Sequence, residues 1–355
     1  MRKKICFFSS SFGFNRQATL DILEKILPKD IEMYLFVPKN SQPIYSPKRS
    51  ILVQNTSTKF SSFFSLRNFC RRKKIDRIIN LGVLPQEELV MIFSSLFTNT
   101  DFVSNYIGNP LAFASGKLSR WSIKSFFETI LFWFLSPFPK KILVCSKDIT
   151  LFWKKFLPFF QKKIFHVPVP IDTELFSPKN KVLSRKKLGL PNKPTIIFVG
   201  RIEYLKGSDI LLELIRRNPS KQFILIGKLN DSSFKKQELE NLLLIDSKTS
   251  KELVYYYNSA DLCIFPSRLE SFGIVPREAM SCGVPAIVSD ISALRTIEPA
   301  IKAFPSPEIF NREIEKYFNL PQKEKQTLSK LSRDFVIKEC DYSLHKKYFT
   351  EKFAF

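Results

Sequence analysis

The stretch TIIFVGRIEYLKGSDILLELI, residues 195–215, predicts a strand, a turn and a helix in direct succession. Its first five residues are an apolar run typical of a buried strand, and Gly200 permits a sharp exit from that strand. Ser208 and Asp209 have side chains suited to the N-cap of the apolar helix that follows. A strand that leads directly into a helix is the repeating unit of a parallel sheet, so this stretch indicates an α/β protein.

The same alternation recurs on both sides of this stretch. The strand-like runs are ICFFSS (5–10), EMYLFV (32–37) and KILVCS (141–146) before it, and QFILIG (222–227), DLCIFP (261–266) and PAIVSD (285–290) after it. A chain of 355 residues exceeds one ordinary core, so we expect two domains. Two doubly wound domains that face each other would bind a ligand in the cleft between them, beyond the carboxyl ends of their strands.

Prolines at positions 168, 170 and 178 interrupt regular structure and predict a domain boundary. We expect an N-terminal Rossmann-like domain over residues 1–175 and a C-terminal Rossmann-like domain over residues 176–340. The helical segment over residues 341–355 is expected to pack back on the N-terminal domain. The first strand should lead into a glycine-bearing turn at Gly13.

The composition indicates a basic globular protein. Lys and Arg number 56 and Asp and Glu 33, so the net charge is +23. Such a surplus favours an anionic partner, which could be nucleic acid, acidic lipid or a phosphorylated substrate; a lysine-rich surface without a partner is the alternative. The six cysteines form no C-x-x-C pair, which predicts buried, reduced thiols in a cytoplasmic protein, without disulfides or a zinc site.

Two loops contain the candidate site residues. In the first stretch, Arg201 and Lys206 lie in the turn before a helix N-terminus, where cations and backbone amides can bind a phosphate group. The second loop lies in SRLESFGIVPREAMSCGVP, residues 267–285, which also predicts a strand exit, a turn and a short helix. Glu270 and Glu278 are placed there to accept hydrogen bonds from sugar hydroxyls, although a glutamate can also simply favour a helix N-terminus.

Together, GRIEYLKG and PSRLESFGIVPREAMSCGVPAIVSD resemble the retaining GT-B glycosyltransferases of family 4, with their E-x7-E pattern. The resemblance is close over roughly residues 140–290. It implies a GT-B fold, in which two Rossmann-like domains face each other across a cleft. It also implies transfer of a sugar from a nucleotide-sugar donor to an acceptor with retention of configuration, in the synthesis of a glycan or a cell-envelope polysaccharide.

The resemblance also assigns roles to individual residues. It places Arg201 and Lys206 on the donor diphosphate, Glu270 on the donor sugar and Glu278 on the nucleotide ribose. The backbone amides of four consecutive residues would surround the sugar and phosphate; these residues are Phe272, Gly273, Ile274 and Val275. Gly13 would belong to the donor-binding side of the N-terminal domain.

No metal and no cofactor are expected. The chain contains no Asp-x-Asp, so the usual metal–diphosphate clamp is absent, and two fixed cations with helix dipoles would stabilise the leaving group instead. The sequence departs from the family at its N-terminal histidine, because the corresponding segment FVSNYIGNP (102–110) has Asn105, Tyr106 and Asn109 instead.

The acceptor side is marked by basic segments rich in aromatic residues, KLSRWSIKSFFETILFWFLSPFPKK (117–141) and LFWKKFLPFFQKK (151–163). Such segments can lie on an anionic membrane, so a lipid-linked acceptor and a peripheral position on the cytoplasmic face of the membrane are expected. The aromatic residues could equally be core. A basic nucleic-acid-binding protein and a GT-B protein without catalysis remain as alternative functions.

Overall fold

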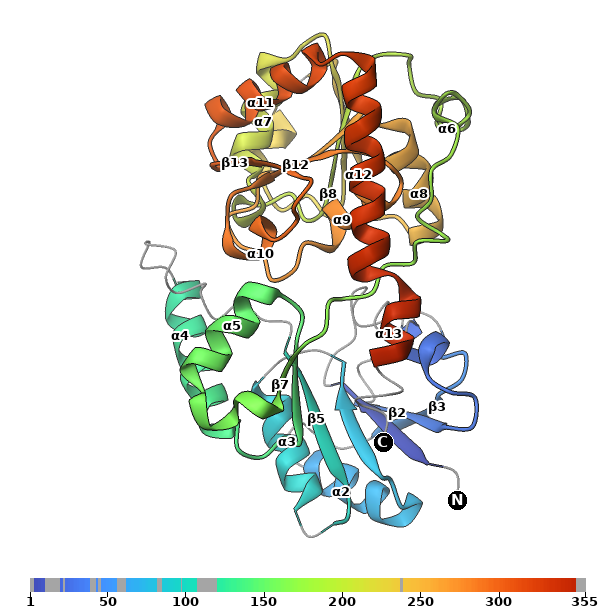
Figure 1. Cartoon of the computed structure of the whole chain (residues 1–355), viewed down its shortest axis with the longest axis vertical. Coiled ribbons are helices and arrows are strands. Elements are labelled where there is room, and N and C mark those ends of the chain that lie inside the picture. Colours follow the sequence, from blue (N-terminus) through green and yellow to red (C-terminus); the bar gives the residue numbers. More distant parts are fainter. Residues whose placement is uncertain are drawn as a thin grey trace. The chain divides into compact units, whose positions relative to one another are not determined.

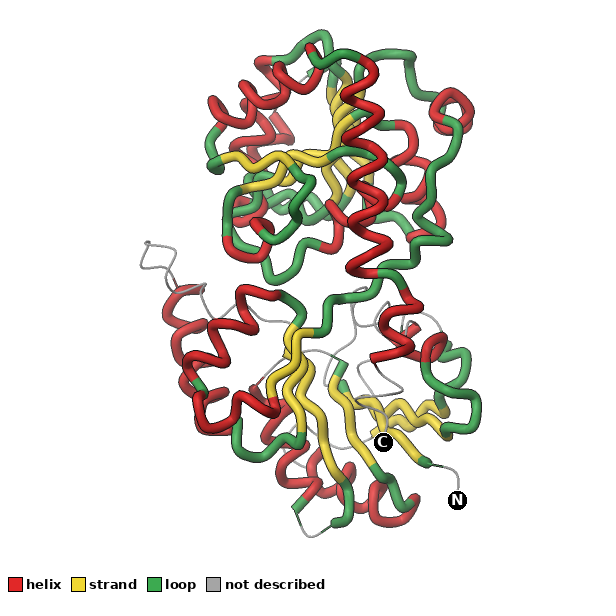
Figure 2. The backbone as a smooth tube through the Cα atoms, in the orientation of Figure 1, coloured by secondary structure: helices red, strands yellow, loops and turns green. Residues whose placement is uncertain are grey.

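The computed structural model of the chain describes residues 3–9, 20–21, 23–38, 43, 46–55, 62–81, 85–96, 98–106, 120–236 and 239–348. The chain divides into two compact units: unit 1 comprises Met1–Val169 and Ser343–Phe355, and unit 2 comprises Pro170–Tyr342. Each unit contains a parallel sheet flanked by helices (Figures 1 and 2). The division falls six residues before the predicted boundary, within the proline-rich crossover.

The described strands of unit 1 form a seven-stranded sheet in the order β3-β2-β1-β4-β5-β6-β7, and every neighbouring pair is parallel. The strands are β1 (Lys4–Phe8), β2 (Glu32–Pro38), β3 (Ile51–Asn55), β4 (Arg77–Asn80), β5 (Asp101–Tyr106), β6 (Lys141–Val144) and β7 (Ile164–His166). The helices whose bounds lie within the described residues include α2 (Ser62–Lys73), α3 (Pro85–Ser95), α4 (Arg120–Leu135), α5 (Lys147–Phe156), the 3-10 helix η2 (Pro158–Lys163) and α13 (Tyr342–Tyr348).

Unit 2 contains a six-stranded parallel sheet in the order β10-β9-β8-β11-β12-β13. Its strands are β8 (Thr195–Val199), β9 (Gln222–Ile226), β10 (Leu242–Ile245), β11 (Leu262–Phe265), β12 (Ala286–Ser289) and β13 (Ile301–Ala303). Its helices are α6 (Lys181–Leu188), α7 (Ser208–Arg217), α8 (Ser250–Ser259), α9 (Ile274–Ser281), α10 (Ser292–Arg295), α11 (Pro307–Asn319), α12 (Gln322–Cys340) and the 3-10 helices η3 (Tyr204–Lys206) and η4 (Ser232–Lys236).

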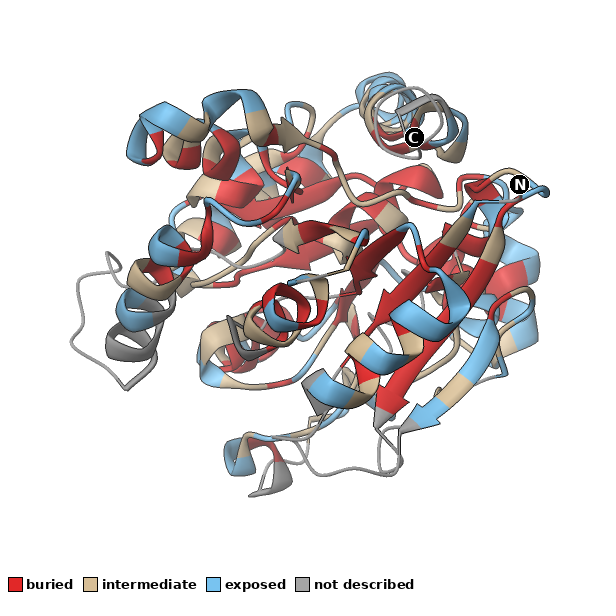
Figure 3. Ribbon diagram, turned by 90° about the horizontal axis from the view of Figure 1, so that it is seen from below, coloured by how far each residue is buried: buried red, intermediate tan, exposed pale blue. Residues whose placement is uncertain are grey.

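The sheets form the cores of both units. Every residue of β4, β8, β11 and β12 is buried, which is expected where helices cover both faces of a parallel sheet. The helices instead alternate buried and exposed positions (Figure 3). In unit 1, α4 and α5 are joined by the rings of Phe132 and Trp153, whose centroids lie 4.5 Å apart in a buried cluster.

Two further observations concern the cysteines and membrane-spanning helices. All six cysteines are buried, as predicted from their scattered positions, and none forms a disulfide with another. Within the described ranges, no helix has the length and apolar character needed to cross a membrane.

Candidate active site

The candidate site lies at the carboxyl ends of β8 and β11, which are neighbours in the sheet of unit 2. From β8 the chain continues to β9 on one side, whereas β11 leads to β12 on the other side. The loops that leave β8 and β11 therefore diverge, and such a switch point is where open α/β sheets bind ligands. Both loops predicted to contain site residues start here.

The loop after β8 contains two glycines with positive φ, Gly200 and Gly207. Gly207 has φ +77 and precedes α7 directly, so it is the N-cap residue. The N-cap prediction for Ser208 and Asp209 is therefore wrong. These residues are the first of the helix, and their side chains bind elsewhere: Ser208 donates a hydrogen bond to Asp231 (2.5 Å) and Asp209 pairs with Arg268.

The loop after β11 ends at Gly273, which has φ +77 and caps α9. Pro276 lies in the first turn of α9 and Gly283 follows its end with φ +78, as predicted. The amides of Gly273, Ile274 and Val275 have no partner within the helix, because the first turn of a helix has no preceding carbonyl groups. They can therefore donate to an anion or to a sugar oxygen.

Buried Arg277 holds this loop in shape. Its guanidinium donates hydrogen bonds to the carbonyl oxygens of Phe272 and Gly273 and lies 3.8 Å from the centroid of the Phe272 ring. A Cβ atom on Gly273 would overlap the side chain of Leu294. The backbone around the helix N-terminus is thus fixed by contacts on two sides.

Several contacts join the two loops, including a 2.9 Å hydrogen bond from the backbone amide of Arg268 to the carbonyl oxygen of Leu205. The backbone of Gly207 lies so close to Pro266 that a Cβ atom on Gly207 would overlap the Pro266 carbonyl oxygen. Arg268 forms a two-fold ion pair with Asp209 (2.7 and 2.8 Å) and donates to the carbonyl oxygen of Tyr204. An ion pair between Lys206 and Glu270 also joins the loops.

This ion pair brings together two residues predicted to bind the donor. The side chains of Lys206 and Glu270 are only 18% and 14% exposed, so water screens their attraction less than at an open surface. The Lys206 ammonium also lies 5.6 Å from the centroid of the Phe265 ring. The switch point thus contains a fixed cation, Lys206, in direct contact with a fixed anion, Glu270.

Arg201 is placed differently. It lies in the same loop, but its side chain is 59% exposed and its guanidinium pairs with Glu203 at 3.1 Å. The long side chain can still rotate toward an anion, because most of the Arg201 side chain is open to solvent. Its predicted role on the diphosphate stays a prediction.

Glu278 lies on α9 and meets Tyr257 of α8. The Tyr257 hydroxyl donates a 2.8 Å hydrogen bond to one carboxylate oxygen of Glu278. Burial raises the pKa of Glu278 to about 7, and the hydrogen bond from Tyr257 opposes that rise. Glu278 can therefore exchange a proton near neutral pH. The pair could not be found from the sequence, because nothing in the local pattern links Tyr257 to the helix after β11.

The N-terminal candidate residues are described only in part. Gly13 and Asn109 lie outside the described residues, as does the side chain of Tyr106. Asn105 lies in β5, and its backbone amide donates a 2.6 Å hydrogen bond to the side chain of Asn80 at the end of β4. This hydrogen bond fixes the backbone of Asn105 against the end of β4.

A buried carboxyl group lies near the same edge of the unit 1 sheet. The hydroxyl of Ser104 donates a hydrogen bond to Glu88, whose pKa burial raises to about 7. Among the described residues, no cluster of three His, Cys, Asp or Glu side chains is arranged to hold a metal ion.

The sequence similarity to a known protein family lies in the C-terminal half of the chain. Residues 180–333 match the family model described as Glycosyl transferases group 1. A D-inositol 3-phosphate glycosyltransferase from Segniliparus rotundus is 33% identical over 148 residues, which cover 38% of this chain and 33% of the relative. That from Frankia alni is 34% identical over 146 residues, which cover 36% of each. The match thus spans about one third of the length of these curated relatives.

Solved structures resemble the whole chain. Sucrose-phosphate synthase from Thermosynechococcus elongatus has a TM-score of 0.83 at 17% identity, over 99% of this chain and 98% of that one. Anabaena HepE in complex with UDP-glucose has a TM-score of 0.78 at 14% identity, over 99% of each chain. WaaG, a glycosyltransferase involved in lipopolysaccharide biosynthesis, has 0.72 at 13% identity, over 98% of this chain and 100% of that one.

The fold and the site define a class. The chain has the GT-B fold, with two parallel-sheet α/β domains. Its residues 180–333 match the glycosyl transferases group 1 model, and this match contains all the described candidate residues of unit 2. The predicted fold class is confirmed, and the match over residues 180–333 agrees with the predicted resemblance to glycosyltransferases, whereas the retaining character stays a prediction.

Proposed function

We propose that the protein is a retaining glycosyltransferase that moves a sugar from a nucleotide-sugar donor to an acceptor. The observation that supports this most is the convergence at one switch point of a cation, two carboxylates and a helix N-terminus. These are Lys206, Glu270, Glu278 and the start of α9. They suit a ligand that is both a phosphate ester and a polyol.

Each group has a chemical role in this proposal. Lys206 and Arg201 stabilise the negative charge that builds on the diphosphate as it leaves, assisted by the amides at the N-terminus of α9. Glu270 accepts hydrogen bonds from the donor sugar, and Glu278 accepts them from the ribose hydroxyls. The departing phosphate oxygen takes the proton of the acceptor hydroxyl, so no protein nucleophile and no metal ion are needed.

A thermal-shift screen against UDP, GDP, ADP and their sugar conjugates tests the donor. Binding to the native state stabilises it, by about 2.7 kcal/mol at a ligand concentration of 100 Kd. We expect one nucleotide family to raise Tm, and the rise to be lost in Lys206→Ala. Binding without sugar transfer would instead indicate a GT-B protein that has lost catalysis. A mobility shift of DNA or RNA, with no nucleotide response, would favour the nucleic-acid alternative.

We also propose a lipid-linked acceptor and a peripheral position on an anionic, cytoplasmic membrane face. The support is the surface formed by α4, α5 and η2 in unit 1, called the aromatic surface. Large apolar side chains are exposed there, including Phe127 at 64%, Phe134 at 60% and Phe159 at 93%. Lys155 of α5 and Lys162 of η2 are also exposed. Basic surfaces with exposed aromatic rings suit the interface of anionic lipids.

Sedimentation with phosphatidylglycerol vesicles tests this surface. Phe134→Ser and Phe159→Ser should each reduce vesicle binding, and Phe304→Ser is the matched control, since Phe304 is 66% exposed in unit 2. Charge reversal at Lys155 and Lys162 should weaken binding by about 1 kcal/mol per residue at low salt. If wild type stays in the supernatant at low salt, a water-soluble acceptor becomes the better proposal.

A further inference from the structure

Unit 2 has a second polar site at the opposite edge of its sheet. A cavity of about 630 Å³ is lined by Pro194, Asp261 and Pro285, which directly precede β8, β11 and β12. Residues of α6 and α12 also line it. Because the donor loops follow the other ends of β8 and β11, this cavity lies at the amino-terminal edge of the sheet, away from the candidate active site.

The cavity is strongly basic. Its lining contains seven Lys and Arg side chains but only two carboxylates, those of Asp261 and Asp334. The surplus is five positive charges within one cavity. Like charges held this close repel one another, and an anion placed among them removes that repulsion.

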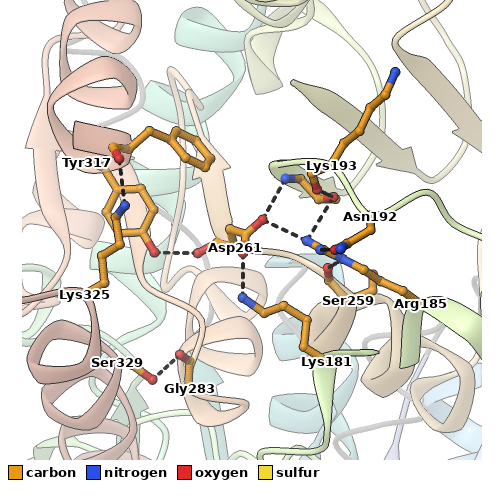
Figure 4. A network of polar contacts seen from close by, with 12 residues as sticks. Lys181, Arg185, Asn192, Lys193, Ser259, Asp261, Gly283, Tyr317, Lys325 and Ser329 are labelled. Atoms are coloured by element: carbon orange, nitrogen blue, oxygen red, sulfur yellow. Dashed lines mark hydrogen bonds and ion pairs between the residues drawn. The ribbon is translucent and has the colours of Figure 1, made fainter. Parts of the chain in front are cut away.

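One wall of the basic cavity is already neutralised. The carboxylate of Asp261 binds Lys181 Nζ at 2.5 Å and Arg185 Nη2 at 2.9 Å (Figure 4). Arg185 is buried and also donates to the carbonyl oxygen of Ser259. These contacts fix α6 against the start of β11, so we assign this wall a structural role.

The other wall, formed by α12, is not neutralised in the same way. Residues 322, 325, 326, 329, 330, 333 and 334 line the cavity, which is one helical face. Lys325 donates to the carbonyl oxygen of Phe318 at 2.7 Å, and Arg333 donates to that of Ser281. Carbonyl groups position these cations but leave their charges in place.

Three exposed lysines, Lys179, Lys193 and Lys330, complete the cationic lining. Among the described residues, no ion pair compensates Lys193 or Lys330. In Figure 4, the side chain of Lys193 points away from the carboxylate of Asp261. Lys193 and Lys330 both line the cavity and are exposed, so their ammonium groups remain available to a ligand.

We propose that this basic cavity binds a ligand bearing a phosphate or diphosphate group. Its size is that of a small-molecule site rather than of a single ion. Lysine and arginine bind phosphate oxygens by charge-assisted hydrogen bonds, and Gln326 and Asn258 in the lining can bind other polar atoms of the ligand. The ligand is either a free phosphorylated small molecule or the headgroup of an anionic lipid.

The test pairs two double variants. Lys193→Gln with Lys330→Gln removes two cavity charges, and Lys323→Gln with Lys338→Gln removes two exposed charges of α12 outside the cavity. Calorimetric titration with pyrophosphate is carried out in a Lys206→Ala background, which weakens binding at the candidate active site. We expect the cavity pair to raise the Kd for pyrophosphate about tenfold, and the control pair to change it less than about twofold.

Flotation with phosphatidylglycerol vesicles distinguishes the two sources of phosphate. Loss of pyrophosphate binding in the cavity pair supports a free phosphorylated ligand, and selective loss of vesicle binding supports a lipid headgroup. The proposal is overturned if the cavity pair changes neither measurement, or if both pairs weaken binding equally through net charge. Neither result depends on sugar transfer, so the test is independent of the proposed function.

Discussion

The ammonium group of Lys206 and the carboxylate of Glu270 form an ion pair that joins the loop after β8 to the loop after β11. Both side chains are mostly buried, so each charge is compensated by the other rather than by water. A donor that binds here must compete for Lys206 with its diphosphate and for Glu270 with its sugar hydroxyls. Only a ligand that offers both groups replaces both halves of the pair.

Lys206→Ala should therefore reduce sugar transfer by more than the loss of one surface charge would. We expect a cost of about 2–4 kcal/mol in transition-state stabilisation, on the scale of other groups that stabilise a developing anion. The measurement is kcat/KM with the nucleotide sugar found in the screen. Lys323→Ala, an exposed lysine of α12, is the control. An unchanged kcat/KM in Lys206→Ala would contradict the donor assignment.

Tyr257→Phe should weaken nucleotide binding by about tenfold at pH 7, because the Glu278 carboxylate loses a charge-assisted hydrogen bond. Without that bond the pKa of Glu278 rises further, so the loss should shrink at pH 9, where the carboxylate is ionised in both proteins. Calorimetry at the two pH values measures this. The neighbouring Tyr256→Phe should behave like wild type, and a loss independent of pH would argue for a packing role alone.

The pKa of Glu278 also predicts how stability depends on pH. Its folded value of about 7 exceeds its ordinary value of 4.5, so the native state binds more protons than the unfolded state between these two pH values. Stability therefore falls as pH rises through this window, by about 3 kcal/mol for this group. Denaturant unfolding of Glu278→Gln should lack that decrease. Parallel pH profiles for the variant and wild type would contradict the assigned pKa.

Gly207→Ala should destabilise the protein more than Gly189→Ala. Both glycines have positive φ, which costs an alanine about 1–2 kcal/mol. A Cβ atom at Gly189 meets nothing within 4 Å, whereas at Gly207 it overlaps the Pro266 carbonyl oxygen. We expect a further loss of about 1–3 kcal/mol and weaker nucleotide binding only for Gly207→Ala. Equal Cm values for the two variants would show that the loops can separate without cost.

Transfer activity should survive EDTA, because the proposed charge stabilisation comes from Arg201, Lys206 and backbone amides. The assay compares EDTA-treated protein with the same protein after addition of magnesium or manganese. Activity that disappears with EDTA and returns with either ion would overturn the metal-independent route.

The strand–loop–helix units were predictable because their causes are local. The apolar run before Gly200 and the glycine at position 273 specify a strand exit or a helix start whatever surrounds them. The N-cap of α7 could not be predicted in this way. Gly207 takes that position in close contact with Pro266, which follows a different strand, β11. The Tyr257–Glu278 bond likewise depends on the packing of α8 against α9, which no single segment contains.

The division of the chain into units has a consequence for its synthesis. Unit 2 is one continuous segment, whereas unit 1 also needs the residues from Ser343 onward. Among these, His345 is buried and its ring nitrogen donates a hydrogen bond to the carbonyl oxygen of Pro168. Because this segment of unit 1 is translated after the whole of unit 2, unit 2 can fold before unit 1 is complete.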